Sequence, residues 1–125
     1  MNARELRRSC LALTGAVEDF PFGPNTSVFK VAGKMFALSQ LGRAPLEISL
    51  KCEPEIALQL RGSYAAIRAG YHLNKRHWNT VTLDGSIPDQ FVQDMIEDSY
   101  DLVVSGLPKR TREQLGWVAL AREAE

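Results

Sequence analysis

The clearest pattern of hydrophobic and polar positions along the chain is a strict alternation over residues 46–52. Leu, Ile, Leu and Cys occupy every second position, with Glu, Ser and Lys between them. Because successive side chains of a strand point to opposite faces, this pattern predicts a strand with one apolar face and one solvated face. Two β-prone runs, 28–31 and 35–38, flank a glycine-containing turn at 32–34 and predict an antiparallel hairpin.

A second pair of strands is expected in the middle of the chain. Val and Leu alternate with Thr over residues 79–83, and Asp84-Gly85 then turns the chain. A shorter β-prone run at 71–73 precedes it. We therefore predict two strands, at 71–73 and 79–83, joined by a turn that contains residues 74–77.

Three helices are expected, over residues 2–15, 54–62 and 88–106. The first begins with a capping box, because Glu5 follows Asn2 at the required spacing. The second has proline in its first turn, and glycines follow all three. The third has the strongest amphipathic pattern. Its polar face is an acidic stripe that we expect to be a solvated surface, formed by Asp94, Glu97, Asp98 and Asp101.

Two segments are expected to lack regular structure. In residues 16–27, two prolines, a glycine and an asparagine argue against a strand or helix, and Val17, Phe20 and Phe22 are expected to anchor the loop to the core. The segment 107–125 is expected to be a peripheral tail, with a last helical turn around residues 113–118.

The order of elements predicts the fold class. Alternating strands followed by amphipathic helices imply an α+β two-layer sandwich of order α-β(3)-α-β(2)-α, with an antiparallel sheet covered by helices on one face. A chain of 125 residues is long enough to bury its own core, so residues 1–125 are expected to be one domain.

Composition restricts the class of protein further. No window approaches the apolar length of a membrane span, so no membrane partner is expected and the predicted location is cytoplasmic. Cys10 and Cys52 are expected to be reduced, because cytosolic proteins keep their thiols free. A monomer is expected, although no pattern in the sequence decides the oligomeric state.

Charge is segregated along the chain although its formal total is zero. Residues 56–83 contain no Asp or Glu, whereas residues 84–108 contain no Lys or Arg. A zero total removes the simplest argument for nucleic-acid binding, a globally basic protein, but the segregation leaves a local basic surface possible.

The stretch 71–80 gathers both histidines, His72 and His77, around two adjacent cations. Zinc needs three or four ligands and neither cysteine lies nearby, so no metal site is expected. No glycine pattern that cradles phosphate is present, and no cofactor is expected. The segment offers His77 no partner carboxylate for acid–base work, so the sequence favours a protein that is not an enzyme.

Two interpretations of this stretch remain open. Lys75 and Arg76 on an exposed turn suit phosphate contacts, Asn74 and His77 suit hydrogen bonds, and Trp78 suits packing against a sugar or an unstacked base. Alternatively, Trp78 belongs to the core and the two cations are simply solvated.

Four segments, 15–23, 29–37, 70–81 and 99–103, closely resemble the MmcQ/YjbR family of small bacterial proteins. The resemblance covers nearly the whole chain in the expected order, and the segment around His77-Trp78 is its most specific part. It implies a fold like that of type III secretion chaperones and of the frataxin-like CyaY proteins.

The resemblance also implies a function, since members of this family are commonly described as DNA-binding proteins with two wings. The hairpin at Gly33 and the turn at 75–77 are then the candidate wings. The alternative is a protein-interaction or chaperone-like module that holds its partner on the open sheet face or at residues 20–22. The full set of candidate DNA-binding residues is Asn74, Lys75, Arg76, His77, Trp78, Lys30, Lys34 and Lys51.

Overall fold

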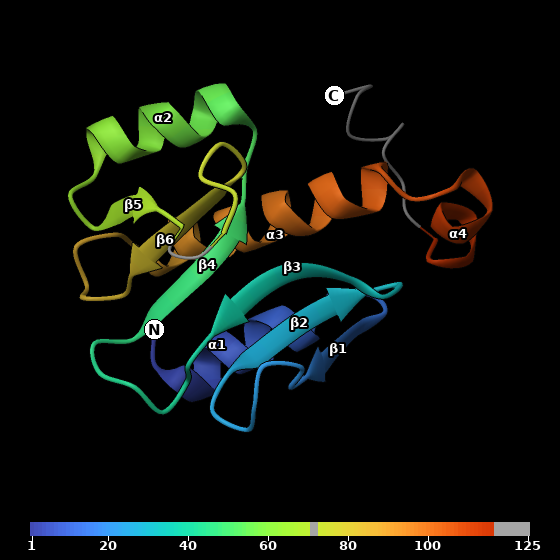
Figure 1. Ribbon diagram of the computed structural model, residues 1–125, viewed down its shortest axis with the longest axis horizontal. Helices are drawn as coiled ribbons and strands as arrows, with labels where there is room; N and C mark the ends of the chain where they lie inside the picture. The colour runs from blue at the N-terminus through green and yellow to red at the C-terminus, as the bar shows by residue number, and fades with distance from the viewer. Residues whose placement is uncertain (71–72, 117–125) are drawn as a thin grey trace.

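The computed structural model of the protein describes residues 1–70 and 73–116. Six strands form one sheet in the order β1-β2-β3-β4-β6-β5, and every neighbouring pair is antiparallel. The elements, drawn in Figure 1, are α1 (Ala3–Leu11), β1 (Ala16–Asp19), β2 (Ser27–Val31), β3 (Lys34–Ser39), β4 (Glu47–Lys51), α2 (Pro54–Ser63), β5 (Ile67–Ala69), β6 (Trp78–Thr82), α3 (Asp89–Ser105) and α4 (Lys109–Gln114).

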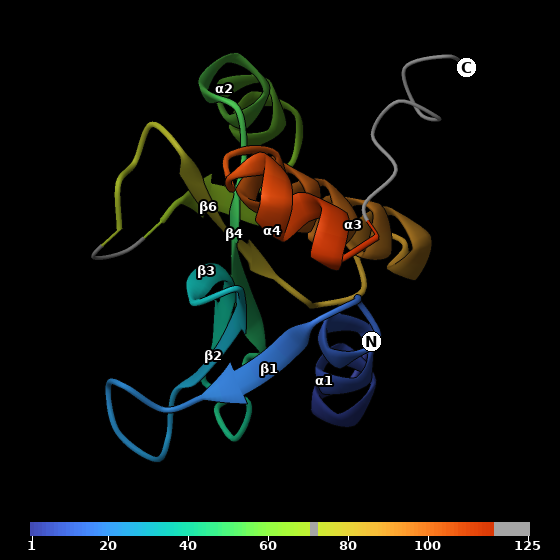
Figure 2. The same ribbon diagram turned by 90° about the vertical axis from the view of Figure 1, so that its right-hand side faces the viewer.

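The predicted α+β class with an antiparallel sheet is confirmed. Figure 2 shows the sheet nearly edge-on, with α1 and α3 on one side. The core lies between these layers, where Phe29, Phe36, Ile48 and Ile96 are completely buried. The loops 20–26 and 73–77 project on the other side of the sheet (Figure 2), which we call the open side.

The predicted hairpin is present as β2 and β3. Ala32 and Gly33 have φ angles of 49° and 79°, as a two-residue type I′ turn requires, and Val31 pairs with Lys34. The strand predicted at 46–52 is also confirmed, as β4. The face of β4 that we expected to be solvated is only partly accessible to solvent, because Ser49 on this face is 7% exposed.

The prediction that residues 16–27 lack regular structure was wrong at their start. Residues 16–19 form the edge strand β1, in register with β2 from Ala16–Val31 to Asp19–Val28. An edge strand pairs with one neighbouring strand and buries few of its side chains, so the hydrophobic pattern of residues 16–19 indicates a strand only weakly. Phe20 and Phe22 are 45% and 68% exposed, so the expectation that they anchor the loop was also wrong.

The strand that pairs with β6 is β5, earlier in the chain than predicted. Residues 71 and 72 of the expected strand lie outside the described residues, and Leu73 is in a bend. A Cβ atom on Gly70 would lie 2.9 Å from Cβ of Trp78, so the chain passes very close to β6 there. Ala-Ala-Ile-Arg-Ala gives no alternating signal, which is why β5 was missed.

The three predicted helices are confirmed, including the capping box between Asn2 and Glu5 in α1. The final turn begins earlier than expected, as α4. The segment after residue 106 also contacts the body of the domain as far as residue 116. Leu107 is buried in the core, and a Cβ atom at Gly15 would lie 2.6 Å from Cδ2 of Leu115.

A β-bulge at Phe36 shapes the centre of the sheet. Phe29 pairs with Ala37 and Lys30 with Met35, so Phe36 has no partner on β2 and its ring enters the core. The hydroxyl of the buried Ser99 on α3 donates to the carbonyl of Phe36 at 2.6 Å and accepts from the backbone N–H of Lys51 at 2.9 Å. Ser99 therefore joins β3 to β4 where the strands no longer pair directly.

Candidate functional site

The turn at 73–77 presents two neighbouring cations to solvent. The backbone N–H of His77 donates to the carbonyl of Asn74 at 3.1 Å, and that of Arg76 donates to Oδ1 of Asn74 at 3.0 Å. Lys75 and Arg76 are exposed, and His77 is half-buried. Asn74 therefore shapes the turn, which holds Lys75 and Arg76 at its tip.

A buried amide and an arginine fasten this turn to α2. Nε of Arg61 donates to Oδ1 of Asn79 at 2.7 Å, and its guanidinium also donates to the carbonyl of Lys75. Nδ2 of Asn79 donates to the carbonyl of Ala57 at 3.3 Å. The turn is tied to β4 as well, because the N–H of Cys52 donates to the carbonyl of His77 at 2.7 Å.

Replacing Asn79 with alanine is expected to lower the free energy of unfolding by about 2–3 kcal/mol. The change removes the acceptor for a charged guanidinium and the donor for the Ala57 carbonyl, and Asn79 is only 3% exposed. Urea denaturation measures the effect. Asn74→Ala, at an exposed residue of the same turn, is the control and should cost clearly less. Equal losses for the two variants would contradict a structural role for the buried amide.

Trp78 is 9% exposed and lies on the open side of the sheet, outside the main core cluster. Gly70 and Leu73 of the preceding loop lie against it. Its ring is therefore not a free platform for an unstacked base. The exposed aromatic side chains of the loop 20–26 are Phe20 and Phe22.

The remaining candidate lysines do not gather in one place. Lys30 forms an ion pair with Asp19 at 2.9 Å, and hydrogen bonds from Lys30 and from the N–H of Phe20 lower the pKa of that carboxyl group. Lys34 is exposed at the β2–β3 turn, far from the 73–77 turn beside α2 (Figure 1). Lys51 is half-buried and pairs with Trp78 across the strands. The two candidate wings are thus separate features.

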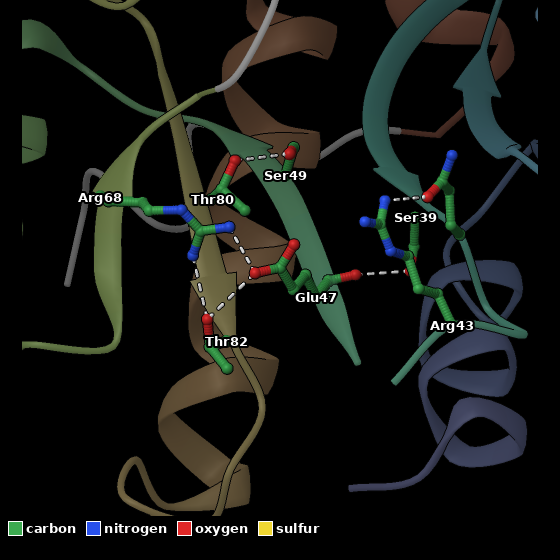
Figure 3. A network of polar contacts seen from close by, with 8 residues as sticks. Ser39, Arg43, Glu47, Ser49, Arg68, Thr80 and Thr82 are labelled. Atoms are coloured by element: carbon green, nitrogen blue, oxygen red, sulfur yellow. Dashed lines mark hydrogen bonds and ion pairs between the residues drawn. The ribbon is translucent and has the colours of Figure 1, made fainter. Parts of the chain in front are cut away.

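A polar network covers the open side of β4, β6 and β5 (Figure 3). Ser49 and Thr80 share a hydrogen bond of 2.8 Å, and Arg68 donates to Oγ1 of Thr82 at 3.0 Å. Arg68 also forms an ion pair with Glu47, which accepts a further hydrogen bond from Thr82. Among the described residues, none of the large hydrophobic side chains of β4, β5 and β6 is exposed, so these strands offer no apolar patch of the kind that holds a partner segment.

A groove of about 460 Å³ lies on the helical side, between α2 and α3. Its lining is mainly apolar, with Leu50 and Val81 from the sheet, Ile56 and Leu60 from α2, and Phe91, Met95 and Leu102 from α3. Acidic residues from α3 and from the N-cap of α2 also line it, and the stripe on α3 is solvated as expected, because Asp94, Glu97 and Asp98 are exposed. The acidic lining residues are Glu53, Asp98 and Asp101.

The groove was not predicted from the sequence, because a stripe at helical spacing does not reveal how closely the opposite helix approaches. Ile56 is 45% exposed, a clear departure from a core position. The feature of the sequence that could have indicated a groove is the acidic Asp98, which lies between Met95 and Leu102 on the same stripe of α3.

The two cysteines are in separate environments and both are free. Cys10 is buried, and burial together with the charge of Glu18 raises its pKa to about 12. Cys52 lines the groove, where burial first and Asp98 second raise its pKa. Both are therefore thiols, not thiolates, at neutral pH.

Neither a cluster of metal-binding side chains nor a helix able to span a membrane is found among the described residues. Residues 1–70 and 73–116 contain no cluster of three His, Cys, Asp or Glu side chains arranged to hold a metal ion. His72 lies outside these residues. None of the described helices has the length and apolar character that crossing a membrane requires.

Comparison with known proteins identifies the family. The family model named YjbR matches residues 11–102, which is most of the chain. The chain belongs to the YjbR family. This confirms the resemblance seen in its sequence motifs. Among relatives of this YjbR-family protein, YjbR of Escherichia coli K12 is 36% identical over 115 residues, covering 92% of this chain and 98% of that protein.

Two further relatives support the same assignment. YbdF of Escherichia coli O157:H7 is 42% identical over 96 residues, covering 77% of this YjbR-family chain and 79% of that protein. The crystal structure of Deinococcus radiodurans protein DR2400 superposes with a TM-score of 0.86 at 41% identity, covering 92% and 88% of the two chains. The fold is therefore that of solved bacterial homologues.

Proposed function

We propose that this YjbR-family protein is a DNA-binding protein without enzymatic activity, which contacts phosphates from the open side of its sheet. The observation that carries this proposal is the separation of charge between the open side of the sheet and helix α3. Among the described residues, the open side and its 73–77 turn carry five cations and two carboxylates, the latter already paired with Lys30 and Arg68. The cations are Lys30, Lys51, Arg68, Lys75 and Arg76.

Helix α3, on the other side of the sheet, has the opposite character, whereas α1 on that side carries Arg4, Arg7 and Arg8. From residue 84 to residue 108, which includes all of α3, the chain has six carboxylates and no Lys or Arg. A polyanion approaching the protein is thus favoured at the open side and repelled at α3, so the charge distribution orients the encounter.

In this proposal the exposed Lys75 and Arg76 make the principal phosphate contacts. Arg61 and Asn79 hold the turn in one conformation, so less conformational entropy is lost when DNA binds. Lys51 extends the surface along β4, and Trp78 supports the turn from beneath. His77 lies at the end of the turn, where its imidazole is half-buried.

The expectation that the protein is not an enzyme is part of the same proposal. The Cys52 thiol has a raised pKa, which disfavours a nucleophilic role. Among the described residues, His77 forms no ion pair with a carboxylate that would orient it as a base. A cytoplasmic location, where DNA is accessible and thiols stay reduced, also belongs to the proposal.

The test is a titration of a short labelled duplex, followed by fluorescence anisotropy over a range of salt concentrations. Lys75→Ala with Arg76→Ala should weaken binding at low salt and lower the slope of log K against log salt by about 2, because two phosphate contacts are lost. Lys109→Ala with Arg110→Ala, on α4 at the far end of α3 (Figure 1), makes the same change in net charge and is the matched control.

Absence of duplex binding by the wild-type protein at low salt would rule out the proposal. Equal loss of affinity in the two double variants would assign any binding to net charge and would contradict the role given to the 73–77 turn.

A further inference from the structure

The groove between α2 and α3 is a second surface, on the side of the sheet opposite the proposed DNA contacts. Leu50, Asn79 and Val81 form its floor. The rings of Tyr64 and Phe91 meet at one end, with centroids 5.4 Å apart and planes inclined by 38°. At about 460 Å³ the groove falls within the range of about 300–1,000 Å³ that is usual for ligand sites.

Each wall of the groove is a stripe of apolar side chains along one helix. On α2 the lining residues Ile56 and Leu60 are four positions apart, and on α3 Phe91, Met95 and Leu102 are four and seven positions apart. Because Ile56 remains 45% exposed, the two stripes leave apolar surface uncovered between them. Two apolar walls of this kind suit an amphipathic helix laid along the groove.

The charge along the groove is negative. Its described acidic lining residues are Glu53, Asp98 and Asp101, whereas the side chain of Lys51 belongs to the open side, beside Trp78. The acidic stripe of α3 extends from Asp94 to Asp101, a rise of about 10 Å at 1.5 Å per residue. Negative charge distributed over two turns of helix complements a chain that carries several cations better than it complements a small molecule with one.

We infer that this groove binds an amphipathic helix of a partner protein, with apolar residues on one face and Lys or Arg beside them. The apolar face enters between Ile56 and Leu60 of α2 and Met95 and Leu102 of α3. The flanking cations lie over the acidic stripe of α3. Because the groove and the open side are on opposite sides of the sheet, the protein has room for this helix and for DNA at the same time.

The probe is a fluorescein-labelled peptide of about 16 residues, long enough to form a helix, with Leu at helical spacing and Lys on either side. A second peptide has Glu in place of every Lys. The Lys peptide should bind, and the Glu peptide should bind at least about tenfold more weakly, because it meets like charge along α3.

Two variants of α2 form a matched pair. Ile56→Arg places a cation and extra volume in the groove and should weaken binding of the Lys peptide by about tenfold or more. Leu58→Arg makes a comparable change in an exposed residue of the same helix that does not line the groove, and should change binding by less than about twofold. Both side chains are exposed, so both variants should fold.

Alkylation of the thiols gives a second readout on the wild-type protein. At alkaline pH, where a fraction of the Cys52 thiol ionises, iodoacetamide should modify Cys52, which lines the groove, and saturating Lys peptide should slow this reaction. Cys10 is buried and should stay unmodified with or without peptide, which makes it an internal control for unfolding.

Several outcomes would overturn the inference. They are no binding of the Lys peptide, equal binding of the Glu peptide, equal loss in the two arginine variants, or unchanged alkylation of Cys52. Protection of Cys52 by a small apolar dye without any effect of the Lys peptide would indicate a small-molecule site instead, and would also overturn it.

Discussion

Replacing Phe36 with alanine should lower the free energy of unfolding by about 3–5 kcal/mol, which is a large part of the 5–15 kcal/mol typical of a domain. Phe36 is completely buried, and its ring meets that of Tyr100 edge-on with centroids 5.4 Å apart. Because the bulge turns this residue into the core, its removal leaves a cavity between β3 and α3 that neither element can close alone.

Urea denaturation of the variant measures this loss, and Phe22→Ala is the matched control. Phe22 is 68% exposed in the loop 20–26, so the same truncation there should change stability by no more than about 0.5 kcal/mol. Similar losses for the two variants would show that Phe22 is covered in solution, and would contradict the exposed position of that loop.

Replacing Ser99 with alanine should cost about 2–4 kcal/mol, although only one oxygen atom is removed. The hydroxyl satisfies the Phe36 carbonyl and the Lys51 N–H together, and Ser99 itself is completely buried. Each buried polar group left without a partner costs about 1–3 kcal/mol. Since the bulge separates β3 from β4 at this point, no other strand is positioned to replace the lost hydrogen bonds.

The control for this second change is Ser105→Ala, at the exposed last residue of the same helix. Its hydroxyl donates to the carbonyl of Leu102 at 2.8 Å, so both variants lose a hydrogen bond and both gain the helix propensity of alanine. Ser105→Ala should be nearly neutral. A loss in Ser99→Ala no larger than that in Ser105→Ala would contradict a stabilising bridge between the strands.

Periodicity was sufficient to predict the class of fold and most of its elements. The alternation in β4, the capping box of α1 and the long amphipathic stripe of α3 are local patterns, because each is set by which side of one element is buried. Family motifs in the sequence were equally reliable. β1 and β5 were misplaced because they are short edge strands whose stability comes from the strand beside them.

The candidate sites depend on distances between residues that are far apart in the sequence, and no local sequence pattern contains these distances. The sequence by itself determined that Lys75 and Arg76 occupy a turn, and that acidic residues line one face of α3. The tertiary structure decided that Trp78 is buried, that Arg61 and Asn79 fasten the turn, and that Lys34 lies elsewhere. It also decided that α2 and α3 leave a groove, because the distance between two helices depends on how each packs on the sheet beneath them.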